Sequence, residues 1–153
     1  MERQIEIMAP AGNFEALMAA IQGGANSIYF GVENLNMRSH SANNFTMADL
    51  PEITRICSEN NVKSYLTLNI IMYNEDLEKG KQTLQAALDA GVSAVIASDI
   101  SVILYARSIG LEVHISTQAN ISNIEAVRFY SQFADVVVLA RELNMEQVKE
   151  IHN

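Results

Sequence analysis

The chain has 153 residues, of which 49% are apolar and 18% charged, and its formal net charge is −8. This length allows a single domain with a buried core, and this composition excludes a disordered chain. No apolar run reaches the roughly 18 residues that a membrane-spanning helix needs, and residues 1–4 show no signal-peptide pattern. We therefore expect a cytoplasmic protein that does not enter a membrane. The negative charge argues against nucleic acid bound by this segment alone, because clamping a phosphate backbone takes clustered Lys and Arg.

Apolar, β-rich runs alternate with helical patterns six times along the chain. The expected strands cover residues 5–8, 27–32, 62–68, 94–97, 112–115 and 136–139. The expected helices cover residues 14–22, about 46–60, 74–90 and 99–109, then a helix that starts at Asn120 or Ser122 and passes Tyr130, and a last helix capped by Asn144 and Gln147.

Local signals at two of these helices support the assignment. Thr46 and Asp49 resemble a capping pair for the second helix, and Pro51 comes late for a first-turn proline, so we expect a 3₁₀ turn there or a helix that restarts at Pro51. Asp99 is a candidate cap for the fourth helix. The connection formed by residues 33–45 is polar and longer than usual, which is typical of a functional loop.

Strand and helix in regular alternation predict a parallel sheet. Six βα units could form an open doubly wound sheet or part of a (β/α)₈ barrel, which usually needs about 250 residues. Polar residues follow nearly every strand, and this pattern suits the mouth of a barrel better than one crevice. The sequence thus favours an α/β fold that is an incomplete TIM-like barrel of about six βα units, with residues 1–153 as one domain.

The richest group of polar side chains follows the fifth strand. It comprises His114, Ser116, Thr117, Gln118 and Asn120. Residues two apart on a strand share a face, so His114 and Ser116 should point the same way, and Gln118 would follow if the strand continued. If that face is the barrel interior, His114 is a candidate acid–base group; otherwise it is a core histidine, and the small polar residues are helix caps.

Five further residues are candidate ligand-binding groups by position. Arg38, in the long polar loop, could clamp a carboxylate or phosphate or could be a solvated arginine. Arg141 and Glu142 follow the last strand and could reach the mouth or pair with each other on the surface. Asn69 and Asp99 lie after the third and fourth strands, and Asp99 has helix capping as an equal alternative.

Several kinds of site find no support in the sequence. There is no dinucleotide fingerprint, Walker loop, zinc-protease helix or nucleophile elbow. The histidines at 40, 114 and 152 lack metal-ligand spacing, and we predict no metal site. The lone cysteine, Cys57, lies on the apolar side of a helix and is expected to be a buried structural thiol.

Taken together, several motifs resemble the collagenase-like peptidases of family U-32. They are residues 6–13, 24–31 and the Arg38 loop that ends at 44–46, followed by residues 66–69, Ser98 with Asp99, residues 114–120 and residues 138–143. The resemblance implies that this chain is the amino-terminal portion of a longer barrel. It also implies further cysteines beyond residue 153, which in several members hold an iron–sulfur cluster. No cofactor is therefore expected in this chain, and Cys57 matches no motif cysteine.

The resemblance leaves three functions open. The first is a peptidase segment that binds a small anionic or peptide ligand at the carboxyl ends of the strands. The second is an iron–sulfur-dependent protein of RNA or quinone-precursor hydroxylation, and the third is a non-catalytic assembly module that self-associates through open sheet edges. His114 beside Ser116 or Thr117 lacks an orienting third group, so no catalytic triad is predicted.

Overall fold

The structure of the chain is a computed structural model that describes residues 5–33 and 45–152. It contains a six-stranded parallel sheet in which each strand pairs with the next along the chain, in the order β1-β2-β3-β4-β5-β6. The strands are β1 (Met8–Pro10), β2 (Ser27–Phe30), β3 (Lys63–Leu68), β4 (Ala94–Ala97), β5 (Glu112–Ile115) and β6 (Val136–Val137).

A helix follows each strand, as the alternating pattern predicts. The helices are α1 (Phe14–Gln22), α2 (Leu50–Glu59), α3 (Leu77–Ala90), α4 (Ile100–Ser108), α5 (Ile124–Tyr130) and α6 (Met145–His152), with 3₁₀ turns η1 (Met47–Asp49), η2 (Asn74–Asp76) and η3 (Thr117–Ala119). Within the described ranges, none of these helices has the length and apolar character required to cross a membrane.

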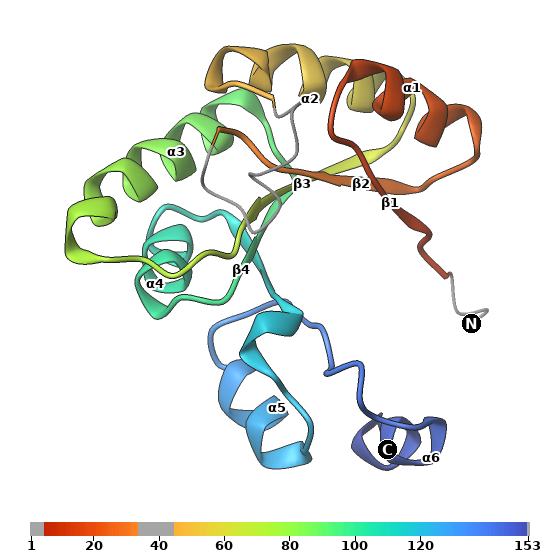
Figure 1. Ribbon diagram of the computed structural model, residues 1–153, viewed down its shortest axis with the longest axis vertical. Helices are drawn as coiled ribbons and strands as arrows, with labels where there is room; N and C mark the ends of the chain where they lie inside the picture. Colours follow the sequence, from red (N-terminus) through yellow and green to blue (C-terminus); the bar gives the residue numbers. More distant parts are fainter. Residues whose placement is uncertain (1–4, 34–44, 153) are drawn as a thin grey trace.

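The sheet curls into part of a barrel, with α1 to α4 along its outer side (Figure 1). Alternate strand residues divide between its two faces. Ile28 and Leu66 pack with helix residues of α1 and α2 on the outer face, whereas Tyr29 and Tyr65 belong to a small separate cluster on the other, concave face. The predicted α/β fold, an incomplete TIM-like barrel of six βα units, is confirmed.

Three of the predicted caps and turns agree with the structure. The Asp49 carboxylate accepts a hydrogen bond from the Thr46 backbone N–H at 2.7 Å, and η1 precedes α2 with Pro51 in the first turn of that helix. Asp99 accepts from the Ser101 backbone N–H at 2.8 Å. Asn144 and Gln147 exchange two backbone-to-side-chain hydrogen bonds of 2.9 Å at the start of α6.

The first strand differs from the prediction. It covers Met8–Pro10 instead of residues 5–8, and Ile5 and Ile7 are 81% and 61% exposed. The Ile7 N–H donates to Asn26 Oδ1 at 2.8 Å. A side-chain oxygen therefore replaces the backbone carbonyl that would accept this hydrogen bond in a regular sheet. Apolar character misled the prediction, because these isoleucines lie at the outer edge of the sheet and not in the core.

The start of α5 also differs. Asn120 has φ 51°, the left-handed conformation that ends η3, so it cannot begin a helix. The cap is Asn123, whose backbone is extended and whose side-chain oxygen accepts from the Ala126 N–H at 2.9 Å. The last strand is shorter than predicted, two residues in place of four.

Candidate functional site

His114 lies on the concave face of the sheet and is only 6% exposed. Its Nε2 is 2.8 Å from Oε1 of Glu112, two residues earlier on β5. The imidazole also meets the ring of Tyr65 from β3 edge-on, with centroids 4.6 Å apart and an interplanar angle of 60°. The histidine is thus held from two sides, by a carboxylate of its own strand and by an aromatic ring from two strands away.

Tyr65 is fixed in turn by Glu6, which precedes β1. The Tyr65 hydroxyl donates to Glu6 Oε1 at 2.6 Å, and Nζ of Lys63 lies 3.1 Å from Glu6 Oε2. Burial of Tyr65 and its hydrogen bond to Glu6 raise the pKa of the phenol. Partial burial opposes ionisation of Glu6, but the bonds from Tyr65 and Lys63 outweigh it, and its pKa lies below the usual value of 4.5.

The lowered pKa of Glu6 predicts an acid-dependent loss of stability. A carboxylate with a depressed pKa contributes stability above its unfolded-state pKa and loses it as the pH falls through the folded-state value. Glu6→Gln should therefore be less stable than wild type near pH 6, and the difference should shrink below about pH 4. Urea denaturation at several pH values measures it. Glu125→Gln, at an exposed i,i+3 pair with Arg128, is the control and should show little difference at any pH.

These contacts lie toward the amino ends of the strands. Lys63 and Glu112 are the first residues of β3 and β5, and Glu6 precedes β1. We name the group Glu6, Lys63, Tyr65, Glu112 and His114 the inner cluster. In TIM barrels the carboxyl end carries the chemistry, whereas the amino end contributes stability. The imidazole therefore faces the interior as predicted, but its partners extend away from the mouth.

At the carboxyl ends, Asn69 and Ser116 are brought together. The Asn69 amide Nδ2 donates to Ser116 Oγ at 3.3 Å, which links the segments that follow β3 and β5. Ser116 is buried and caps η3, accepting from the Gln118 N–H at 3.3 Å. The capping interpretation of Ser116 and its position among the polar strand ends are therefore both correct.

A buried hydroxyl lies just below this link. Thr67, on β3 between Tyr65 and Asn69, has an Oγ1 that is inaccessible to solvent and for which the described part of the chain supplies no hydrogen-bond partner. Leaving a buried hydroxyl unpaired costs free energy.

The remaining predicted site residues are not drawn into one group. The Asp99 carboxylate caps α4, and Ser101 Oγ also donates a hydrogen bond to it. Gln118 and Asn120 are exposed, because the chain turns into η3 instead of continuing the strand, so Gln118 does not follow His114 and Ser116. Arg141 and Glu142 are exposed in the turn after β6, and no ion pair joins them in the structure. Arg38 lies outside the described residues.

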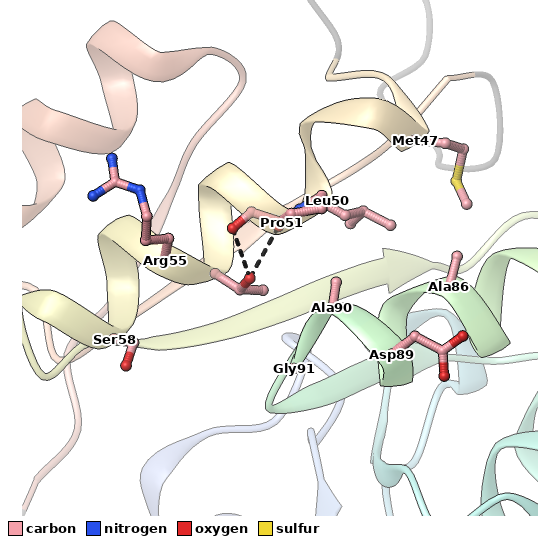
Figure 2. Close-up of a pocket in the computed structure, with 10 residues that line it drawn as sticks. Met47, Leu50, Pro51, Arg55, Ser58, Ala86, Asp89, Ala90 and Gly91 are labelled. Atoms are coloured by element: carbon pink, nitrogen blue, oxygen red, sulfur yellow. Dashed lines mark hydrogen bonds between the residues drawn. The ribbon is translucent and has the colours of Figure 1, made fainter.

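A pocket elsewhere on the molecule is not lined by the predicted site residues. It has a volume of about 620 Å³ and lies between α2 and α3, on the outer side of the sheet (Figure 2). Thr54, on its wall, bonds back to the carbonyls of Leu50 and Pro51, and Arg55 is engaged with Glu52 and Glu59. Its polar side chains are therefore occupied within their own helix, and we assign it no function.

The chain offers no ligand set for an iron–sulfur cluster. Cys57 is the single cysteine of the sequence, it is buried in the core, and burial raises the pKa of its thiol to about 11. A cluster needs several thiolates, so any such group would take its ligands from elsewhere. Among residues 5–33 and 45–152, no three His, Cys, Asp or Glu side chains are grouped so that they could hold a metal ion.

Comparison with known families gives a match over nearly the whole chain. The family model described as peptidase family U32 matches residues 12–153. The chain belongs to peptidase family U32. It is 61% identical over 147 residues to a protein named collagenase from Porphyromonas gingivalis, covering 96% of this chain and 36% of that protein.

Other U32 relatives carry different names. The chain is 36% identical over 149 residues to tRNA hydroxylation protein P1 of Bacillus subtilis, covering 95% of this chain and 35% of that protein. The U32 chain thus spans about a third of the length of these relatives. In structure it resembles the U32 peptidase Mk0906, with a TM-score of 0.80, 15% identity, and coverage of 99% of this chain and 66% of that one.

Sequence reasoning identified His114 but missed the residues that hold it. Glu112 could have been found, because it is two positions earlier on the same strand and must share a face with His114. Tyr65 and Glu6 could not, since their approach depends on which strands lie next to each other and on how the sheet curls. Thr67 is part of the motif at residues 66–69, yet nothing in the sequence distinguishes a buried, unpaired hydroxyl from an exposed one.

Proposed function

We propose that this chain is the ligand-binding part of a collagenase-like peptidase, and that it binds a peptide on the concave face at the carboxyl ends of the strands. The observation that carries the proposal is the 61% identity to the Porphyromonas gingivalis collagenase over 147 residues. The matched region covers 96% of this chain, and the carboxyl ends of the strands are where ligands bind in α/β barrels.

The side chains at those strand ends suit a peptide. Asn69 and Ser116 already form one amide-to-hydroxyl bond, and Gln118 and Asn120 add two exposed carboxamides. Amides and hydroxyls both donate and accept hydrogen bonds, as a peptide backbone requires. An anionic end of the ligand would bind Arg141, together with Arg38 of the polar connection formed by residues 33–45.

Peptide hydrolysis needs an activated nucleophile, and His114 is the candidate base in this chain. Hydrolysis uses either a side-chain nucleophile beside a base or an activated water. His114 could take a proton from an attacking water bound on the concave face. The groups that stabilise the developing negative charge are not identified among the described residues.

A second candidate function is RNA hydroxylation. It is favoured by the 36% identity to tRNA hydroxylation protein P1 and the 32% identity to the 23S rRNA 5-hydroxycytidine C2501 synthase of Escherichia coli. The net charge of −8 gives this segment no attraction for a phosphate backbone. On this alternative, RNA contacts and cluster ligands would both come from outside the chain.

One experiment separates the two functions. The full-length protein is incubated with denatured collagen, new amino termini are counted, and RNA from cells lacking the gene is analysed by mass spectrometry for lost hydroxylation. We expect peptide release that falls in Asn69→Ala and Ser116→Ala, with RNA hydroxylation unchanged by loss of the gene. Ser108→Ala, at the exposed end of α4, is the control. Absence of cleavage together with a missing hydroxylated nucleotide would favour the alternative.

We also propose that the open edges of the sheet mediate association. In the described part of the chain no strand pairs with the outer edge of β1 or of β6, and exposed apolar side chains lie at both edges, with Ile7 at one and Val136 at the other. Edge strands with apolar side chains invite pairing with another strand.

The Ile7 position tests this association. Ile7→Lys should lower the self-association of the 153-residue chain, because a lysine on an edge strand opposes further strand pairing. The measurement is the molar mass by light scattering over a range of protein concentrations. Ile71→Lys, at an exposed isoleucine in the connection after β3, is the matched control and should leave the mass unchanged. A monomer at every concentration in the unsubstituted chain would contradict the proposal.

A further inference from the structure

The side chain of Glu112 is placed to decide which nitrogen of His114 carries the hydrogen. Its Oε1 lies 2.8 Å from Nε2 of His114, and the Glu112 side chain is half exposed whereas that of His114 is nearly buried. A carboxylate accepts hydrogen bonds and cannot donate them. Nε2 must therefore carry the hydrogen, and in the neutral ring the lone pair is on Nδ1.

Tyr65 restricts the rotation of the His114 ring from the other side. Its ring lies 4.6 Å from the imidazole, edge-on, and its hydroxyl is anchored to Glu6 at 2.6 Å. Rotating the imidazole by half a turn would exchange Nε2 with Cε1 and Nδ1 with Cδ2, which would break the bond to Glu112 in a space already bounded by Tyr65. Burial of His114 leaves little water to replace that bond.

We infer that Glu112 is a positioning residue that fixes His114 in the Nε2–H tautomer, and so keeps Nδ1 as the proton-accepting atom of the concave face. Chemistry on the concave face would then use Nδ1 as the base. A bound water gives a proton to Nδ1 while its oxygen attacks the peptide carbonyl carbon with the electron pair. The Glu112 carboxylate at Nε2 stabilises the imidazolium that forms. The C–N bond then breaks, and the leaving amine nitrogen takes the proton from Nδ1.

This inference rests on the base role proposed for His114, but its first test does not depend on activity. The ring nitrogens of His114 are observed by ¹⁵N NMR in the full-length protein labelled at histidine, with His114→Gln used to assign the signals. In the neutral ring, we expect the Nε2–H form alone in wild type. Glu112→Ala should give a mixture of the two tautomers, and Glu112→Gln, whose amide oxygen can still accept, should restore most of the Nε2–H form.

Controls keep the result specific to Glu112. Glu125→Ala removes a glutamate from an exposed pair on α5 and should leave the His114 signals unchanged. An unchanged single tautomer in a folded Glu112→Ala protein would overturn the inference, and so would an Nδ1–H form in wild type. If the tautomer shifts as expected but no peptide cleavage is found in any variant, the positioning role stands and the proposed peptidase function fails.

Discussion

Phe30→Ala is expected to lower the free energy of unfolding by about 3–5 kcal/mol. Phe30 ends β2, is 2% exposed, and meets Phe45 edge-on with ring centroids 5.9 Å apart. Phe45 meets Phe14 of α1 in the same way at 5.0 Å. Truncation of Phe30 therefore removes one end of a group of three rings that meet edge-on around Phe45, and it leaves a cavity where a strand, a helix and the segment before η1 meet.

The measurement for Phe30 is urea denaturation followed by circular dichroism. A loss of this size is a large part of the roughly 5–15 kcal/mol by which a domain is usually stable. Phe129→Ala is the matched control, because Phe129 also meets aromatic rings edge-on, those of Tyr130 and Phe133, but is 50% exposed. We expect it to cost about 1 kcal/mol or less. Equal losses at the two positions would contradict the assignment of the core to the outer face near α1 and α2.

Periodicity predicts which face of the sheet a residue occupies, but only where a strand has neighbours on both sides. In β3, alternate residues go to opposite faces as expected, with Leu66 toward the helices and Tyr65 toward the concave face. At β1 the same reading failed, because Ile5 and Ile7 are apolar yet lie at an edge without a further strand. The sequence shows which face of the sheet a residue prefers. It does not show whether its strand has a neighbouring strand on each side.

In the candidate site, too, the sequence predicts some contacts and not others. Contacts within one strand or turn follow from spacing, as for Glu112 with His114 and for the cap made by Asp99. Contacts between β3 and β5, such as Asn69 with Ser116 or Tyr65 with His114, depend on the curl of the sheet. Curl results from the twist of many strands together, and no short motif encodes it. The sequence singles out the polar residues after β5, but it does not predict the side chains that they contact.

The surroundings of His114 show the same difference between what residue spacing predicts and what the structure adds. The spacing alone leaves a core histidine and an acid–base group as equal interpretations. The structure adds the contacts: a buried imidazole with a charged partner on one side and an anchored phenol on the other. A core histidine also needs a hydrogen-bond partner for its buried ring nitrogen, so the contact with Glu112 fits both interpretations, and substitution of His114 is needed to separate them.

His114→Ala is expected to lower kcat for peptide release from denatured collagen by about 10²- to 10⁴-fold, the usual contribution of a positioned general base. KM should change little, because the proposed peptide contacts come from Asn69, Ser116 and the exposed carboxamides. Release of new amino termini, measured at several substrate concentrations in the full-length protein, gives both constants. His152→Ala, at the end of α6, is the control and should retain wild-type kcat.

A structural contribution of His114 must be separated from a chemical one. Alanine removes the ring that packs on Tyr65, so part of any loss could come from a disturbed inner cluster. His114→Gln keeps a polar side chain that can still bond to Glu112 but has no basic nitrogen. If kcat falls equally in the Ala and Gln variants while thermal stability is kept in the Gln variant, the lost function is proton transfer. Wild-type kcat in His114→Gln would show that the imidazole only supports the fold, and the base would then have to be sought in a different part of the protein.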